Sequence, residues 1–183
     1  LLLIERVIRA DEASGGVDPF SATVYAALLI QLERAQEART VVESALQRAR
    51  DIGNVTAANQ LMSMRAVACR ESGDHACAFE SLETAERHAS QVLPPGHEGR
   101  GALALSRAHL EFRLGNIDGA HERVQEALRI FDAKPGLKGR AAESRELLAR
   151  VLLAEGDAGA AQREATVSRD AYRDILGDDA RSL

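Results

Sequence analysis

The chain has 183 residues, with 28 acidic against 23 basic side chains and a formal net charge of −5. Nucleic-acid-binding domains normally present a basic face, so this balance argues against that class of function. The longest strongly apolar run, residues 24–30, is far shorter than the roughly 20 residues that a membrane-spanning helix needs. We therefore expect neither a nucleic-acid partner nor a membrane partner.

Helical patterns follow one another along the whole chain, and strands are not expected. A first helix is predicted over residues 1–14, and the next begins where Asp18 can cap it, with Pro19 in the first turn. Turns containing Gly, Asn or Pro separate the later helices, which predicts an all-α fold. These helices are expected over residues 18–33, 35–52, 55–71, 75–92, 97–114, 117–133, 139–155 and 158–176. Because the chain opens inside a helical pattern without Met, and residues 178–183 read as another helix start, we expect a fragment of a longer protein.

One pattern recurs three times at a nearly fixed spacing. Gly73, Gly115 and Gly156 lie 42 and 41 residues apart, and each is followed by Asp or Asn. An alanine stands seven residues before each glycine and another five residues after it, and a small residue follows seven positions later. A fainter copy precedes these three, with Glu33 in place of the glycine. The small residues are Ala26, Ala38 and Ala45, then Ala66, Ala78 and Ala85, then Ala108, Ala120 and Ala127, then Ala149, Ala161 and Ser168.

A period of this size indicates a repeat array in which each unit is a pair of helices. Short side chains let two helices cross closely, and larger apolar residues such as Val124 and Leu128 fill the remaining seam. This set of alanines and Gly-Asp turns resembles the tetratricopeptide repeat (TPR) family, in the long-unit variant of about 40 residues seen in bacterial signalling proteins. The first unit departs from the pattern because it lacks the turn glycine.

The resemblance implies a right-handed α-solenoid of about four TPR-like helix hairpins plus flanking helices. The whole chain, residues 1–183, would be a single domain with one continuous core, since each unit of a solenoid packs on its neighbours. The expected units cover about residues 18–53, 54–95, 96–136 and 137–177, and residues 1–14 would be the helix of a truncated preceding unit.

The sequence contains no set of residues with the spacing of a catalytic or metal site. Cys69 and Cys77 flank the Gly73 turn and could approach each other, but we favour two small, buried or half-buried thiols in a reducing compartment. The spacing of His75 from these cysteines matches no tetrahedral zinc pattern. Neither a phosphate-binding glycine loop nor a nucleophile elbow occurs in the sequence. We therefore expect no enzyme activity, no metal and no cofactor.

In arrays of this family the first helix of each hairpin lines a concave surface that binds partners. Some members clamp a C-terminal carboxylate with Lys and Asn, but the corresponding positions here include Thr23 and Ser63, which cannot form that clamp. Arginines facing inward in successive units would form a ladder that grips carboxylates, unless each pairs with a neighbouring glutamate. The predicted partner-binding groove comprises Gln60, Arg70, His109, Phe112, Arg113 and Arg150.

The favoured function is a protein–protein interaction scaffold within a larger, bacterial, cytoplasmic signalling protein, with a protein or peptide partner in the concave groove. The alternative is a small-ligand sensor that regulates an attached transcription-activator or kinase output domain. A closed pocket would favour the sensor, and an open groove would favour the scaffold. The apolar faces of residues 1–8 also predict self-association through the N-terminal helix.

Overall fold

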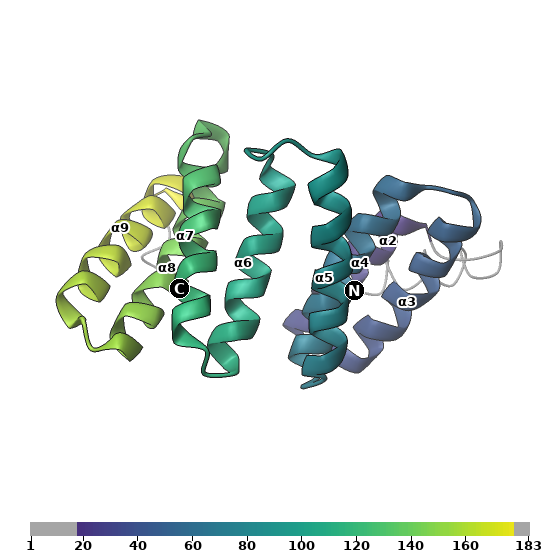
Figure 1. Ribbon diagram of the computed structural model, residues 1–183, viewed down its shortest axis with the longest axis horizontal. Helices are drawn as coiled ribbons and strands as arrows, with labels where there is room; N and C mark the ends of the chain where they lie inside the picture. The colour runs from purple at the N-terminus through teal and green to yellow at the C-terminus, as the bar shows by residue number, and fades with distance from the viewer. Residues whose placement is uncertain (1–17, 178–183) are drawn as a thin grey trace. The chain divides into compact units, whose positions relative to one another are not determined.

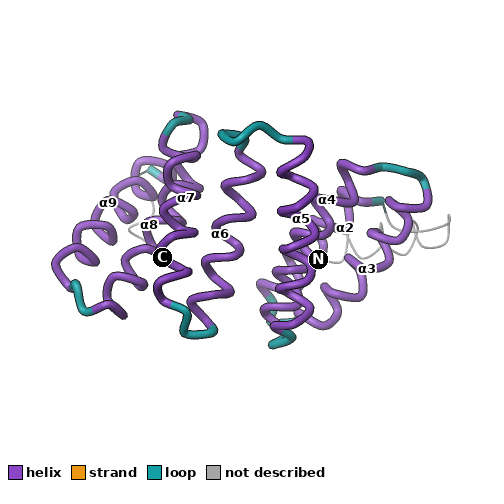
Figure 2. Tube along the Cα trace, viewed as in Figure 1, coloured by secondary structure: helices purple, strands orange, loops and turns teal. Residues whose placement is uncertain are grey.

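The computed structural model describes residues 18–177, and the regular structure in this range is helical (Figure 1). Eight α-helices follow one another as antiparallel pairs, and no strand lies among these residues (Figure 2). The predicted all-α fold is therefore confirmed. The helices are α2 (Pro19–Gln31), α3 (Ala35–Asp51), α4 (Val55–Glu71), α5 (His75–Val92), α6 (Glu98–Arg113), α7 (Ile117–Asp132), α8 (Lys138–Glu155) and α9 (Ala158–Leu176), with a 3₁₀ helix, η1 (Pro135–Leu137), before α8.

The helix boundaries agree with the predicted ones to within two residues. The short helix η1 was not predicted, because Pro135 and Gly136 indicated only a break between helices. The helix expected over residues 1–14, and the helix start expected at residues 178–183, lie outside the described range. None of the described helices is long and apolar enough to cross a membrane.

The chain divides between Gln91 and Val92 into two compact units. Unit 1 contains α2, α3, α4 and nearly all of α5, and unit 2 contains α6 to α9. Within unit 1, α3 packs against both α2 and α4; within unit 2, α7 packs against both α6 and α8, and α9 packs against α8. The single continuous array over residues 1–183, and its right-handed sense, stay predictions.

The turns after α3, α4, α6 and α8 share one backbone device. A left-handed glycine ends the preceding helix, because glycine adopts a positive φ without steric cost. These glycines are Gly53, Gly73, Gly115 and Gly156, with φ of +68°, +81°, +78° and +90°. The Asp or Asn that follows caps the next helix: the Asp157 carboxylate, for example, accepts a hydrogen bond from the amide of Ala160 at 2.8 Å. After α2 the left-handed position is occupied by Glu33, with φ of +60°.

Small residues occupy the helix crossings, as the repeat predicted. Ala108, Ala120 and Ala127 in unit 2 are all 0% exposed. The core of this unit includes Phe131 of α7, which is 2% exposed. Gly101 of α6 makes room for that ring, because a Cβ at this position would lie 2.8 Å from Cε1 of Phe131. Unit 2 therefore depends on close helix packing at alanine and glycine as well as on one large aromatic side chain.

Cys69 and Cys77 form a disulfide, which corrects the expectation of two reduced thiols. Cys69 lies near the end of α4 and Cys77 in the first turn of α5, with their Cα atoms 5.7 Å apart, and both side chains are buried. The tight turn at Gly73 brings the two helix ends together. Disulfides are typical of oxidising compartments. The cysteines therefore no longer support a cytoplasmic location, which stays a prediction.

Candidate partner-binding site

A groove of about 830 Å³ runs along α8 and α9 in unit 2. From α8 it is lined by Glu146, Ala149, Arg150 and Leu153, of which Arg150 belongs to the predicted groove. From α9 the lining consists mainly of alanines, arginines and Tyr172. Apart from Gly177, the described lining residues come from these two helices alone. The site is therefore a groove along one hairpin rather than a cavity enclosed by several helices.

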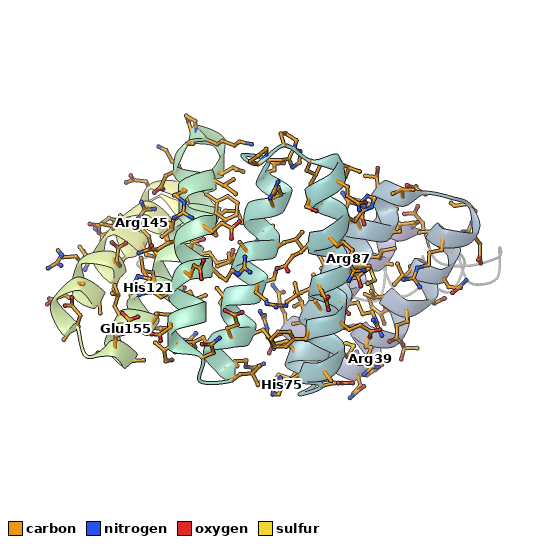
Figure 3. All side chains as sticks on the ribbon, in the orientation of Figure 1. Arg39, His75, Arg87, His121, Arg145 and Glu155 are labelled. Carbon is orange, nitrogen blue, oxygen red and sulfur yellow. A yellow bond between two sulfur atoms is a disulfide. The ribbon has the colours of Figure 1, made fainter. Side chains whose placement is uncertain are left out.

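The preceding hairpin shows what covers the equivalent surface. On α7, Nδ1 of His121 lies 2.6 Å from the carboxylate of Glu155 on α8 (Figure 3). Arg145 of α8 donates a hydrogen bond to Asp132 of α7 at 2.7 Å. Leu128, between these two contacts in sequence, belongs to the same buried cluster as residues of α8. The outer face of α7 is thus covered by the first helix of the next hairpin.

The repeat offset of 41 residues maps this covered face of α7 onto α9. The counterparts of His121, Leu128 and Asp132 are Gln162, Arg169 and Arg173. All three counterparts are exposed and line the groove. A leucine and an aspartate of α7 are therefore replaced by arginines on the equivalent face of α9, which changes both its polarity and its charge.

The guanidinium of Arg150 on α8 lies over the ring of Phe112 on α6, 5.0 Å from the ring centroid. Phe112 is half-buried against the core of unit 2, whereas Arg150 is exposed. No carboxylate pairs with Arg150 among the described residues. A cation–π contact of this kind does not occupy the N–H donors of the guanidinium with a hydrogen-bond acceptor.

The structure brings together two of the predicted site residues, Phe112 and Arg150. Gln60 and Arg70 belong to unit 1, where Gln60 is exposed and Arg70 pairs with Glu71, its Nη2 lying 2.8 Å from the carboxylate. The pairing of Arg70 with its neighbour is the alternative that the sequence left open.

The remaining candidates, His109 and Arg113, lie on α6, where His109 is half-buried and Arg113 is exposed at the helix end. Arg70, Arg113 and Arg150 stand four, five and one residues after the first alanine of their repeats. Successive helix residues point in different directions, so these arginines do not occupy equivalent positions. The counterpart of Arg150 in the preceding repeat is His109.

Unit 1 carries a network of ion pairs between helices. Arg39 of α3 donates to Glu43 at 2.9 Å and to Asp74 at 2.8 Å, and Arg65 of α4 donates to Glu43 at 3.3 Å. Burial opposes ionisation of Glu43, but the two guanidiniums together hold its pKa below the ordinary value. The amide of Cys77 and then the guanidinium of Arg39 lower the pKa of Asp74. These charges are satisfied within the fold, so we assign them to structure rather than to binding.

Tyr172, Arg169 and Arg173 are groove residues that the sequence analysis did not identify. Burial, and then the negative field of Glu143 and Glu146, raise the pKa of the Tyr172 hydroxyl. Comparing α9 with α7 at the repeat offset would have found these residues. Within residues 18–177, no group of three or more His, Cys, Asp or Glu side chains is arranged to hold a metal ion.

Solved structures with this fold are helical repeat proteins. The crystal structure of BtubC (BKLC) from P. vanneervenii matches with a TM-score of 0.73 and 15% identity, covering 96% of this chain and 72% of that one. A Podosopora anserina protein described as a putative kinesin light chain with nearly identical TPR-like repeats matches with a TM-score of 0.59 and 16% identity, covering 85% of this chain and 95% of that one.

A single-residue variant of the Podosopora anserina protein matches to the same extent. No protein-family model matches the chain, and no curated protein matches it. At identities this low the likeness concerns the fold alone. The antiparallel helix pairs, the repeated turn and these structures together show that the chain has a TPR-like helical repeat fold.

Proposed function

We propose that this chain is a protein-interaction scaffold that binds an acidic segment of a partner protein at unit 2. The observation that carries the proposal is Arg150, an exposed cation held over Phe112 and without a carboxylate partner among the described residues. It lines an open groove beside apolar side chains such as Leu153. A TPR-like repeat fold, which typically serves protein interactions through extended surfaces, supports the same conclusion.

The wider setting follows from the sequence. We propose that the scaffold is part of a larger bacterial signalling protein and has no catalytic activity of its own. A cytoplasmic location stays a prediction, and the disulfide between Cys69 and Cys77 argues against it. Nucleic acid and membranes are not among its proposed partners. Self-association through residues 1–8 stays a further prediction, because those residues lie outside the described range.

A small-ligand sensor is the second candidate function, and the size of the groove favours it. A volume of about 830 Å³ is within the range of typical ligand pockets. Ligand pockets usually surround most of their ligand, however, whereas the described lining of this groove comes almost entirely from two helices. We therefore place the sensor second.

Affinity capture with a matched pair of variants tests the scaffold. The full chain, its Arg150→Glu variant and its Arg129→Glu variant serve as baits in an extract of the cells that produce it, and bound proteins are quantified by mass spectrometry. Arg129 is exposed on α7 and does not line the groove, so its variant controls for the charge change alone. We expect at least one protein to be lost with Arg150→Glu and retained with Arg129→Glu. Identical sets of bound proteins would contradict the proposal.

Native mass spectrometry of the chain purified from those cells tests the sensor. A sensor predicts an added small-molecule mass that disappears in Leu153→Trp, which places a larger side chain at the groove. The scaffold predicts the mass of the protein alone.

A further inference from the structure

We propose that Cys69 and Cys77 form a reversible thiol–disulfide switch, in which Cys77 exchanges with an external thiol and Cys69 closes or releases the bond. Oxidation locks the turn between α4 and α5, and reduction releases that turn without unfolding unit 1. The inference goes beyond the proposed scaffold function, because it concerns the regulation of a hairpin and not the binding of a segment. It follows from comparing this turn with its counterparts in the later repeats.

The backbone of the turn holds the two cysteines close together without help from their sulfur atoms. The amide of Asp74 donates a hydrogen bond to the carbonyl of Cys69 at 2.9 Å. The carboxylate of Asp74 accepts a hydrogen bond from the amide of Cys77 at 3.0 Å. One residue therefore ties the end of α4 to the start of α5. The Cα atoms of the two cysteines lie 5.7 Å apart, which is an ordinary separation for a bonded pair.

The turn between α6 and α7 has the same tie, although both cysteines of the chain lie elsewhere. At the repeat offset of 42 residues, the three positions of the tie are occupied by Glu111, Asn116 and Gly119. The amide of Asn116 donates to the carbonyl of Glu111 at 2.9 Å, and its side chain accepts from the amide of Gly119 at 3.2 Å. A Cβ at Gly119 would lie 2.5 Å from Oε2 of Glu111, so a carboxylate fills this crossing.

The turn between α8 and α9 repeats the arrangement with apolar side chains. The amide of Asp157 donates to the carbonyl of Leu152 at 2.9 Å, and its carboxylate accepts from the amide of Ala160 at 2.8 Å. The same hairpin turn therefore closes around a carboxylate in one repeat and around a leucine and an alanine in another. A bond between sulfur atoms is not required to close it, so unit 1 should keep its fold when the disulfide is reduced.

The two sulfur atoms lie in unequal surroundings. Cys77 is in the first turn of α5, where the helix dipole favours a thiolate, and Cys69 is in the last turn of α4, where the dipole disfavours one. Cys77 is 7% exposed, whereas Cys69 is 0% exposed. The negative charge of Asp74 is balanced by Arg39, whose guanidinium donates to it at 2.8 Å. Cys77 is therefore the sulfur that an external thiol reaches, and Cys69 is its resolving partner.

The exchange balances with a dithiol as the reductant. A thiolate of the dithiol attacks Sγ of Cys77, the bond between the cysteines breaks, and Sγ of Cys69 leaves with the electron pair and takes up a proton. The second thiolate of the dithiol attacks the mixed disulfide and releases Cys77, which also takes up a proton. The dithiol ends as a cyclic disulfide, having given two electrons and two protons to the chain. Oxidation by a small disulfide follows the reverse order, in which the thiolate of Cys77 attacks first.

The redox state controls the freedom of the last turn of α4. Cys69 lies directly before Arg70 and Glu71, which pair at 2.8 Å. The hydroxyl of Ser72 donates to the carbonyl of Cys69 at 3.0 Å. While the disulfide is intact, this turn cannot separate from α5, and after reduction only noncovalent contacts hold it. Reduction should therefore let the end of α4 open more often, together with the predicted groove residue Arg70.

The experiment treats the full chain with dithiothreitol in buffer without denaturant. Thiols are blocked with iodoacetamide, and mass spectrometry counts the blocked cysteines. We expect both cysteines to be reduced, with an unchanged far-ultraviolet circular dichroism spectrum, and oxidised glutathione should restore the bond once dithiothreitol is removed. Hydrogen exchange at the amides of Asp74 and Cys77 should become about tenfold faster on reduction, because the cross-link no longer opposes opening. The matched amides of Asn116 and Gly119 should keep their exchange rates.

Two pairs of variants test the assigned roles, with circular dichroism as the check on folding. Asp74→Ala removes the tie and should slow re-oxidation about fivefold, the effect of losing one helix cap. Asp157→Ala removes the equivalent tie between α8 and α9 and should leave re-oxidation unchanged. With one cysteine left, Cys77 in the Cys69→Ser chain should form a mixed disulfide with oxidised glutathione about tenfold faster than Cys69 does in the Cys77→Ser chain.

Several results would overturn the inference. A bond that dithiothreitol reduces only in denaturant would be a permanent structural disulfide. Loss of helical signal on reduction would show that the bond holds unit 1 together. Equal reaction rates in the two single-cysteine chains would remove the role of Cys77, and equal re-oxidation of the Asp74→Ala and Asp157→Ala chains would remove the role of the turn. None of these measurements depends on the proposed binding at Arg150.

Discussion

Replacing Glu33 by glycine should stabilise unit 1. Glu33 holds the left-handed position after α2, with φ of +60°, which glycine holds in the turns after α3, α4, α6 and α8. Its side chain is exposed and makes no hydrogen bond or ion pair among the described residues. Its amide donates to the carbonyl of Ile30 at 3.0 Å, and a glycine amide can make the same bond. The substitution therefore relieves backbone strain without removing a contact.

The size of the effect is the difference between two opposing contributions. A residue with a Cβ costs about 1–2 kcal/mol in the left-handed conformation. Removing the Cβ relieves this cost, but glycine also has more conformational entropy in the unfolded chain, which offsets about 0.5–1 kcal/mol of the stabilisation. We therefore expect Glu33→Gly to raise the free energy of unfolding by about 0.5–1 kcal/mol.

The matched control is the reverse change, Gly115→Glu, in the turn after α6. An added Cβ at Gly115 meets no atom within 4 Å, so its cost is that of the backbone conformation alone. We expect a loss of about the same size. Urea unfolding followed by circular dichroism gives both free energies, and hydrogen exchange should show increased protection in α2 and α3 for Glu33→Gly. If Gly115→Glu destabilises while Glu33→Gly does not stabilise, the backbone account of Glu33 is wrong.

Three further perturbations have defined outcomes. Gly101→Ala places a methyl group 2.8 Å from the ring of Phe131 and should lower the free energy of unfolding by about 1–3 kcal/mol. Adding Phe131→Leu should restore part of that loss, and a double variant no more stable than Gly101→Ala alone would contradict this account. Cys69→Ser should lower the free energy of unfolding by about 2.5 kcal/mol, the loop-closure value for a separation of eight residues. Reductant should lower the free energy of unfolding of the wild-type chain but not that of the variant. Because the pKa of Glu43 is lowered by its arginine partners, its ionisation stabilises the fold above about pH 4.3 and that contribution is lost as the pH falls. The stability of Glu43→Gln should therefore depend less on pH between about pH 5 and pH 2; parallel curves would show that the ion pairs contribute nothing.

The helices could be predicted closely because their ends depend on local chemistry. Gly73, Gly115 and Gly156 each combine a left-handed helix end with a following cap, and both signals are visible in the sequence. Glu33 could be aligned with them only through the alanines around it. Because Cys69 and Cys77 flank the Gly73 turn, the sequence allowed either two free thiols or a disulfide. The expectation of free thiols was wrong, because the turn brings the two residues close enough to bond.

The candidate site was less accessible from the sequence. Arg150 was found because the family resemblance places it on the inner side of a first helix, but its position over Phe112 depends on the packing of α6 against α8. Arg169 and Arg173 were missed because α9 is a second helix, and only first helices were expected to line the binding surface. Their exposure depends on which helix, if any, follows, and a single sequence does not show this directly.

The disulfide also sets how far the chain can be stretched. Force applied to its two ends can extend the α4/α5 turn only as far as the bond between Cys69 and Cys77 allows, whatever happens to the helices on either side. Eight residues of extended chain span about 28 Å, of which the bonded pair retains 5.7 Å between its Cα atoms. In single-molecule pulling, reduction should therefore lengthen the fully unfolded chain by about 22 Å, an increment that depends on covalent connectivity and not on the strength of any repeat.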